Sequence, residues 1–123
     1  MKKYICMLGC VALLSACARK NDTVLPQHNI TAGIEGGYDS KITITETFNG
    51  KTTQVYSGPA DNPYKFNAPV GAQLKIIGSA SYDTSIFAGA DLLVTDNSNP
   101  VSGSQDSYNN GSYYGTLIFT IQK

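Results

Sequence analysis

The residue with the most distinctive chemistry in this chain is Cys17, which ends the sequence Leu14-Ser15-Ala16-Cys17. The start, Met1-Lys2-Lys3, is positively charged, and the 13 residues from Tyr4 to Ala16 are almost wholly apolar. This layout is typical of a secretory signal peptide, and the apolar stretch is too short for a stable membrane span. We therefore expect residues 1–16 to be removed, which leaves a thiol at the new N-terminus.

The order Leu, small residue, Ala, Cys resembles the lipobox of bacterial lipoproteins. The resemblance implies that the Cys17 sulfur takes a diacylglycerol, that the chain is cut before Cys17, and that the new amine is acylated as well. One acyl chain binds a membrane only marginally, whereas two or three hold the protein there. The membrane is thus an expected partner, through lipid on Cys17. The alternative is an ordinary cleaved signal with Cys17 present by chance.

The residues after Cys17 bear on where the chain is anchored. In lipoproteins, Asp directly after the Cys favours inner-membrane retention in enteric-type systems, and this chain has Ala18 there. An acidic run that some lipoproteins use for surface export is not well matched by residues 18–22 either. The resemblance therefore implies a lipid-anchored protein of the bacterial cell envelope, in the outer membrane and facing the periplasm, with surface exposure left open.

Several kinds of catalytic site are excluded by the remaining cysteines and histidine. Cys6 and Cys10 leave with the signal, and Cys17 is acylated, so the mature chain keeps neither a free thiol nor a disulfide. His28 is the sole histidine, and we place it on a flexible tether over residues 17–28. A cysteine nucleophile, a zinc site with Cys ligands and a positioned Ser-His-acid triad are then ruled out. We expect no enzyme, no metal site and no cofactor.

The part from Asn29 to Lys123 forms one predicted domain of 95 residues. Its apolar residues alternate with polar ones, as in Ile42-Thr43-Ile44-Thr45, and no stretch has helical spacing. Asn49-Gly50 is typical of a tight hairpin turn. Strands recur every 8–14 residues. The sequence predicts an all-β fold, a single antiparallel β-sandwich of seven to eight strands, immunoglobulin- or transthyretin-like.

The C-terminal third of the domain gives the clearest and the weakest strand signals. A segment over 86–95 ends in an apolar run suited to a central strand, and a weak strand is predicted over 101–105. Residues 106–111 are predicted as a polar loop. The last strand is the clearest, with alternate residues on one face: Tyr113, Gly115, Leu117, Phe119 and Ile121.

The domain is similar to the periplasmic domain of MmpS-type membrane-anchored proteins. The residues that carry this similarity are Lys41-Ile42-Thr43-Ile44, Pro69-Val70-Gly71-Ala72 before the apolar strand 74–77, and the closing Gly- and Tyr-rich strand. Proteins of that family accompany large export permeases. The resemblance implies an accessory role beside an envelope transporter.

Seven residues form the candidate contact surface. Tyrosines among small polar residues make adaptable contact surfaces, as in antibody loops. The set comprises the loop residues Tyr108, Asn109, Asn110, Tyr113 and Tyr114 with Asp96 and Asn97 from a neighbouring turn. Alternatively, Tyr113 packs in the core and Tyr114 covers an exposed sheet face, because tyrosine favours strands anyway.

The turn Asp96-Asn97-Ser98-Asn99 is also a weak match to an oxygen-rich cation loop. It lacks the glycine and the distal glutamate of an EF-hand. Asp, Asn and Ser are the residues that build ordinary turns, which is the reading we prefer.

Charge and composition narrow the class of partner. From Asn21 onward five lysines stand against nine carboxylates, a net charge of −4, so we expect no nucleic-acid binding. The function predicted is a binding or accessory module for another envelope protein, of which a transporter is one candidate. The alternative is a small structural or inhibitor-type lipoprotein with a protruding loop at 58–63. A third is binding of carbohydrate or another ligand, which the absence of tryptophan weakens.

Overall fold

A computed structural model describes residues 25–86 and 89–123 of the chain. The predicted signal peptide, the lipidation site Cys17 and most of the predicted tether lie outside the described residues. All regular elements in the described part are β-strands: β1 (Gln27–Glu35), β2 (Tyr38–Phe48), β3 (Lys51–Pro59), β4 (Tyr64–Pro69), β5 (Gln73–Ser81), β6 (Asp91–Asp96), β7 (Asn99–Pro100), β8 (Gln105–Asn109) and β9 (Ser112–Thr120).

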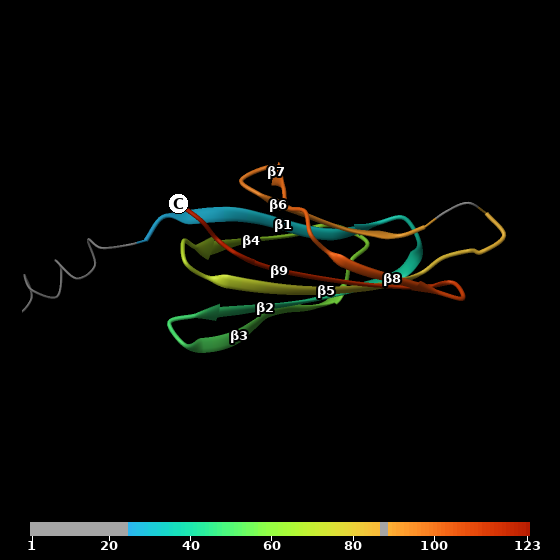
Figure 1. The fold of residues 1–123 in the computed structure, drawn as a ribbon, viewed down its shortest axis with the longest axis horizontal. Coiled ribbons are helices and arrows are strands. Elements are labelled where there is room, and N and C mark those ends of the chain that lie inside the picture. Colours follow the sequence, from blue (N-terminus) through green and yellow to red (C-terminus); the bar gives the residue numbers. More distant parts are fainter. Residues whose placement is uncertain (1–24, 87–88) are drawn as a thin grey trace, which may run out of the picture.

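The strands form two antiparallel sheets that pack against each other (Figure 1). One sheet has four strands in the order β4-β1-β6-β7, and the other has five in the order β3-β2-β5-β9-β8. This arrangement confirms the predicted antiparallel β-sandwich. The described residues contain nine strands instead of seven or eight, because the set includes the two-residue β7 and a polar strand, β8, that the sequence did not reveal.

The strand β8 corrects the prediction of a polar loop over residues 106–111. All five of its residues are exposed, so no alternation of apolar and polar residues marks it in the sequence. It can be polar because it is an edge strand, paired with β9 on one side only. The strand predicted over 101–105 is replaced by the start of β8 at Gln105, and the segment 86–95 forms a strand only from Asp91.

Two Asn-Gly turns connect the hairpins of the five-stranded sheet. Asn49 and Gly50 have φ angles of 51° and 74°, and Asn110 and Gly111 have 46° and 82°. Two successive residues with positive φ match the twist of the flanking strands, which confirms the predicted turn at Asn49-Gly50. The two turns lie at opposite ends of the elongated domain (Figure 1).

The hydrophobic core lies between the two sheets and follows the predicted alternation. On β9, Tyr113 and Leu117 are 0% and 2% exposed, whereas Tyr114 and Ile118 are 59% and 55% exposed. Phe119 lies on the core side but is only partly buried. The other large, fully buried side chains of the core are Ile30, Ile42, Ile44, Leu74, Ile76 and Ile121.

The first strand begins earlier than the sequence indicated. β1 starts at Gln27, so Gln27 and His28 belong to the domain and not to the predicted tether. His28 pairs in register with Ala68 of β4, and its Nδ1 lies 2.6 Å from Oδ1 of Asp96. The prediction that His28 lies on a flexible tether is therefore wrong. The carboxylate that holds it comes from 68 residues further along the chain, a pairing that local sequence does not show.

Candidate functional site

The seven residues of the predicted contact surface do not lie together. Asp96 pairs with Ile30 near the start of β1, whereas the turn at Asn110 lies beside Tyr82 and the end of β5. These positions are at opposite ends of the sandwich (Figure 1). A single surface made of all seven residues is therefore excluded.

Asp96 and Asn97 stabilise the fold through contacts with β1. The Asp96 carboxylate contacts His28, and the side-chain oxygen of Asn97 accepts a hydrogen bond of 2.8 Å from the backbone N–H of Asn29. The backbone N–H of Asn97 in turn donates to the carbonyl of Asn29 at 2.8 Å. These contacts hold the β6–β7 turn against β1, so ordinary turn chemistry accounts for the sequence Asp96-Asn97-Ser98-Asn99.

Tyr113 belongs to the core, as the alternative prediction had it, and not to a contact surface. Its hydroxyl accepts a hydrogen bond of 2.7 Å from the backbone N–H of Leu92 and donates one of 2.8 Å to Oδ1 of Asp106. Burial, followed by the hydrogen bond to Asp106, raises the pKa of Tyr113. A Cβ atom at Gly115 would collide with this hydroxyl, so glycine is required there.

Tyr108 has a similar structural task at the same edge of the sandwich. Its hydroxyl lies 2.7 Å from Oδ1 of Asp91 and 3.0 Å from the carbonyl of Ala90, and its ring packs against Tyr113 with centroids 5.2 Å apart. The hydrogen bond to Asp91 is the largest cause that raises the pKa of Tyr108 to about 12, with burial second. β7 covers only the end of β6. The Tyr113 hydroxyl therefore satisfies the Leu92 N–H on the open edge of β6. The single O–H of Tyr108 lies between the Asp91 carboxylate and the carbonyl of Ala90, the residue that precedes β6.

The outer face of the five-stranded sheet carries the candidate binding surface. The register aligns one residue from each strand into a row across it: Pro59, Lys41, Ser79, Tyr114 and Ser107. The residues that precede or follow these along β2, β5 and β9 point into the core, so the row itself faces solvent.

Three large apolar side chains form an exposed stripe on this face. Tyr114 is opposite Ser79, Ile77 is opposite Thr116, and Ile118 is opposite Lys75. The three apolar residues therefore zigzag between the two neighbouring strands β5 and β9, within diagonal reach of one another. They are 59%, 40% and 55% exposed. We call Tyr114, Ile77 and Ile118 the apolar stripe.

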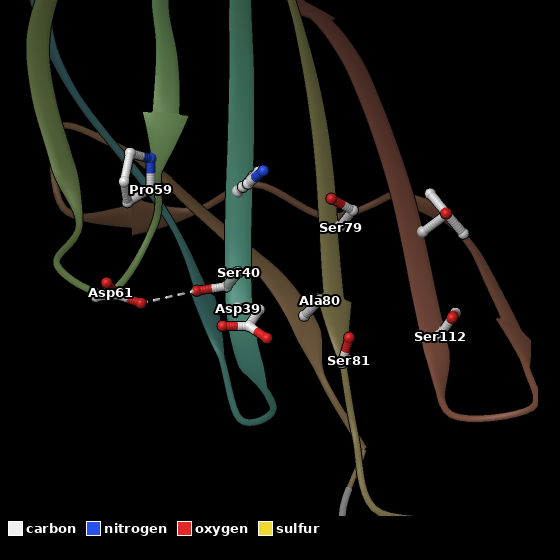
Figure 2. A pocket seen from close by; sticks show the side chains of 10 residues that line it. Asp39, Ser40, Pro59, Asp61, Ser79, Ala80, Ser81 and Ser112 are labelled. Atoms are coloured by element: carbon white, nitrogen blue, oxygen red, sulfur yellow. Dashed lines mark hydrogen bonds between the residues drawn. The ribbon is translucent and has the colours of Figure 1, made fainter.

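A polar hollow of about 490 Å³ adjoins the stripe at its Tyr114 end. Figure 2 shows Ser79 and Ser81 on one strand, Ser112 on a neighbouring one, and Asp39 and Asp61 to the other side. Lys41 and Tyr114 complete the lining with Ser40, Pro59 and Ala80. We call this the serine hollow.

The side chains of the serine hollow leave most of their hydrogen-bonding groups free. Ser40 Oγ donates a long hydrogen bond of 3.4 Å to Oδ1 of Asp61. Within the described residues, neither Asp39 nor Lys41 forms an ion pair, since the single pair found there joins His28 and Asp96. The hollow therefore offers hydroxyl groups, two carboxylates and one ammonium to solvent.

The backbone at Asp39 is in the left-handed region, as it is at the turn residues Asn49, Asn97, Ser98 and Asn110. Its φ angle is 51°, in the left-handed region, and the pairing of β2 with β5 shifts register between Tyr38 and Lys41. This irregularity is a bulge, which re-aims side chains at the end of a sheet. Asp tolerates the left-handed region better than most residues but less well than glycine. Strained positions of this kind cluster at binding sites.

Sequence reasoning missed the serine hollow. The signal in the sequence is faint: small hydroxyl residues at alternate positions, Ser79 and Ser81, at the end of a strand whose other outward residues are larger. Asp39 and Asp61 join them only through the pairing of β2, β3 and β5. Of the predicted contact residues, Tyr114 alone lines the hollow.

The chain was compared with known proteins. No family model, no curated protein and no solved structure matches it. The site must therefore be interpreted from its own geometry.

Residues 25–86 and 89–123 contain no group of three or more His, Cys, Asp or Glu that could hold a metal ion. Within the same ranges no helix is long and apolar enough to cross a membrane.

Proposed function

We propose that this chain is a lipid-anchored protein of the bacterial cell envelope that works as a non-catalytic binding or accessory module for another envelope protein. Its anchor is the acylated Cys17, and its contact surface is the outer face of the five-stranded sheet. The observation that carries the proposal is the apolar stripe: three large apolar side chains exposed side by side at the middle of a sheet face.

The surroundings of the stripe favour a protein partner. Contiguous exposed apolar residues with a polar rim are typical of protein contact sites. The rim here consists of threonine and serine hydroxyls with Lys41 and Lys75, which lie on the same face. Tyr114 suits the centre of such a surface because a tyrosine buries apolar area while its hydroxyl stays hydrogen-bonded.

The position of the surface relative to the anchor supports the same proposal. The chain from Cys17 enters the domain at β1, at the end of the sandwich opposite the β1–β2 turn (Figure 1). β1 has nine residues and so spans about 30 Å. The serine hollow lies beside the start of β2, so it and the Tyr114 end of the stripe are distal to the tether. An anchored domain would present them away from the membrane surface.

An inhibitor with a protruding loop at 58–63 is less well supported. Gly58 and Pro59 belong to β3, and Ala60 is 1% exposed with its N–H bound to the carbonyl of Ser40. Residues held in this way cannot extend into the active site of a protease. The resemblance to MmpS-type accessory proteins stays a hypothesis about who the partner is.

Labelling with radioactive palmitate tests the anchor. We expect the full chain to incorporate label and to fractionate with membranes, and we expect Cys17→Ala to lose both. An unlabelled wild-type protein that is soluble in the periplasm would contradict the anchor and leave the contact surface to be tested separately.

Site-specific cross-linking in cells tests the contact surface. A photoreactive amino acid is placed at Ile118, on the apolar stripe, or at Leu93, an apolar residue 49% exposed on the four-stranded sheet. Leu93 is a matched control because its size and exposure are similar. We expect a reproducible cross-link to one envelope protein from position 118 and none from position 93. Cross-links from position 93 alone would show that the contact surface is on the four-stranded sheet and would contradict the proposal.

A further inference from the structure

We propose that the serine hollow is a saccharide-binding site, which adjoins the protein contact made by the apolar stripe and shares Tyr114 with it. Its lining combines the hydroxyls of Ser79, Ser81 and Ser112 with the carboxylates of Asp39 and Asp61 to one side of them. Tyr114, on the same strand as Ser112, lies opposite Ser79 in the sheet and adds an aromatic ring. This combination fits a ligand that carries many hydroxyl groups on a ring with an apolar face.

The size and polarity of the hollow limit its ligands. Its volume of about 490 Å³ lies in the range of small-molecule sites. Most such sites are lined by apolar side chains, whereas this one is lined mainly by serine, aspartate and lysine. An apolar ligand would therefore leave these groups without hydrogen bonds. A saccharide would satisfy them, because each sugar hydroxyl both donates and accepts.

Two competing ligand classes fit the hollow less well, anions because of its charge and divalent cations because of its ligand set. Two carboxylates against one ammonium give the hollow a net charge of −1, which disfavours phosphate and other anions. A divalent cation needs six or more oxygen ligands for calcium or near-octahedral geometry for magnesium. The two carboxylates lie on different elements, Asp39 on β2 and Asp61 in the β3–β4 turn, and Asp61 already accepts a hydrogen bond from Ser40.

Each type of side chain has a defined task in this site. Asp39 and Asp61 accept hydrogen bonds from sugar hydroxyls, and hydrogen bonds to a charged group are the strong ones. Lys41 and the serine hydroxyls donate to ring and hydroxyl oxygens. Tyr114, 59% exposed, offers a ring face to the apolar side of the sugar.

The conformation of Asp39 supports a binding role. A glycine would adopt its φ of 51° without strain. Aspartate at this position adds a carboxylate to the hollow at some cost in backbone strain.

Nuclear magnetic resonance of the full chain tests the proposal. The acylated protein is held in a zwitterionic detergent without sugar headgroups, and two neutral oligosaccharides, a trimer of N-acetylglucosamine and maltotriose, serve as probes. We expect at least one of them to shift the backbone amide signals of Ser79, Ser81, Ser112 and Tyr114 in a saturable way. The signals of the four-stranded sheet should not move.

Two variants and a control make the result specific. Asp39→Asn keeps a residue that accepts positive φ and removes the charge, and Asp39→Gly removes the side chain with no backbone strain. Each should weaken saccharide binding by about tenfold or more, as expected for a lost hydrogen bond to a charged group. Glu35→Gln, at an exposed carboxylate on β1, should bind as the wild type does.

The outcomes separate this proposal from the protein contact. If Asp39→Asn loses the saccharide but keeps the cross-link from position 118, both proposals stand. If neither oligosaccharide shifts these amides, or if Asp39→Asn binds as tightly as wild type, the saccharide site is overturned while the contact surface is unaffected. Amide shifts produced by calcium alone, with no response to either oligosaccharide, would also overturn it.

Discussion

The two adjacent tyrosines Tyr113 and Tyr114 lie on opposite sides of β9 and have opposite roles. Tyr113 is fully buried, and its hydroxyl joins the edge of the four-stranded sheet to Asp106 on the five-stranded one. Tyr114 is 59% exposed, and no hydrogen bond of its hydroxyl is found among the described residues. One side of the strand is therefore committed to stability and the other is free for binding.

This difference corrects the idea that a cluster of tyrosines is by itself a contact surface. The hydroxyl of Tyr113 bonds to the Leu92 N–H of β6 and to the Asp106 carboxylate, and the hydroxyl of Tyr108 lies at the Asp91 carboxylate beside the carbonyl of Ala90. Tyr113 is buried and cannot reach a partner, whereas Tyr108 remains 49% exposed although its hydroxyl is engaged. The free surface is the other face of the same sheet, where Tyr114 stands with Ile77 and Ile118.

The largest expected effect on stability comes from replacing each of the two tyrosines by alanine in turn, which tests whether one face of β9 is structural and the other is not. Tyr113→Ala should lower the free energy of unfolding by about 3–5 kcal/mol, because it empties a buried aromatic site. Tyr114→Ala should change it by no more than about 0.5 kcal/mol. Urea denaturation followed by circular dichroism measures both. Similar losses of unfolding free energy for the two variants would show that the outer face of β9 is as important for stability as the core face.

Removal of the Tyr113 hydroxyl alone tests the hydrogen bonds at the edge. Tyr113→Phe keeps the ring but leaves the Leu92 N–H and the Asp106 carboxylate without this partner. We expect a loss of about 1–3 kcal/mol in the free energy of unfolding. Tyr114→Phe is the control and should be neutral. A neutral Tyr113→Phe would mean that water replaces the hydroxyl.

Substitution of Asp39 by glycine tests whether the positive φ of this residue lowers the free energy of unfolding. Asp39→Gly relieves the positive φ but makes the unfolded chain more flexible, so we expect a net gain of up to about 1 kcal/mol. Thermal denaturation of Asp39→Gly and wild type measures it. A clear loss of stability would mean that the Asp39 side chain serves the fold.

The smallest expected effect is the contribution of the Tyr108 hydroxyl to stability, which is tested by measuring unfolding at high pH. Its pKa is about 12 in the folded protein against an ordinary value of 10.0, so folding favours the neutral phenol. The stabilisation is fully present below pH 10 and is lost as the pH rises through 12. Wild type and Tyr108→Phe should therefore converge in stability between these pH values. A constant difference across that range would show that Tyr108 titrates normally.

The sequence predicted the fold better than the site, for a physical reason. Alternation along β9 and β2 is a local pattern, and the Asn49-Gly50 turn is set by two neighbouring residues, so both could be inferred. The edge strand β8 was not predicted because all five of its residues are exposed, so no alternation of buried and exposed residues marks it. His28 was misplaced because its partner Asp96 is distant in sequence. The serine hollow depends on the register of four strands, which no local pattern encodes.

The most direct test of the proposed contact compares one substitution on each sheet. Once the partner cross-linked from position 118 is known, its affinity is measured for full chains anchored in vesicles: wild type, Ile118→Ser and Leu93→Ser. The two residues are apolar and 55% and 49% exposed on opposite sheets. We predict that Ile118→Ser weakens binding by at least about tenfold, and that Leu93→Ser stays within about twofold. Equal binding of all three, or loss in Leu93→Ser alone, would contradict the assignment of the contact surface to the five-stranded sheet.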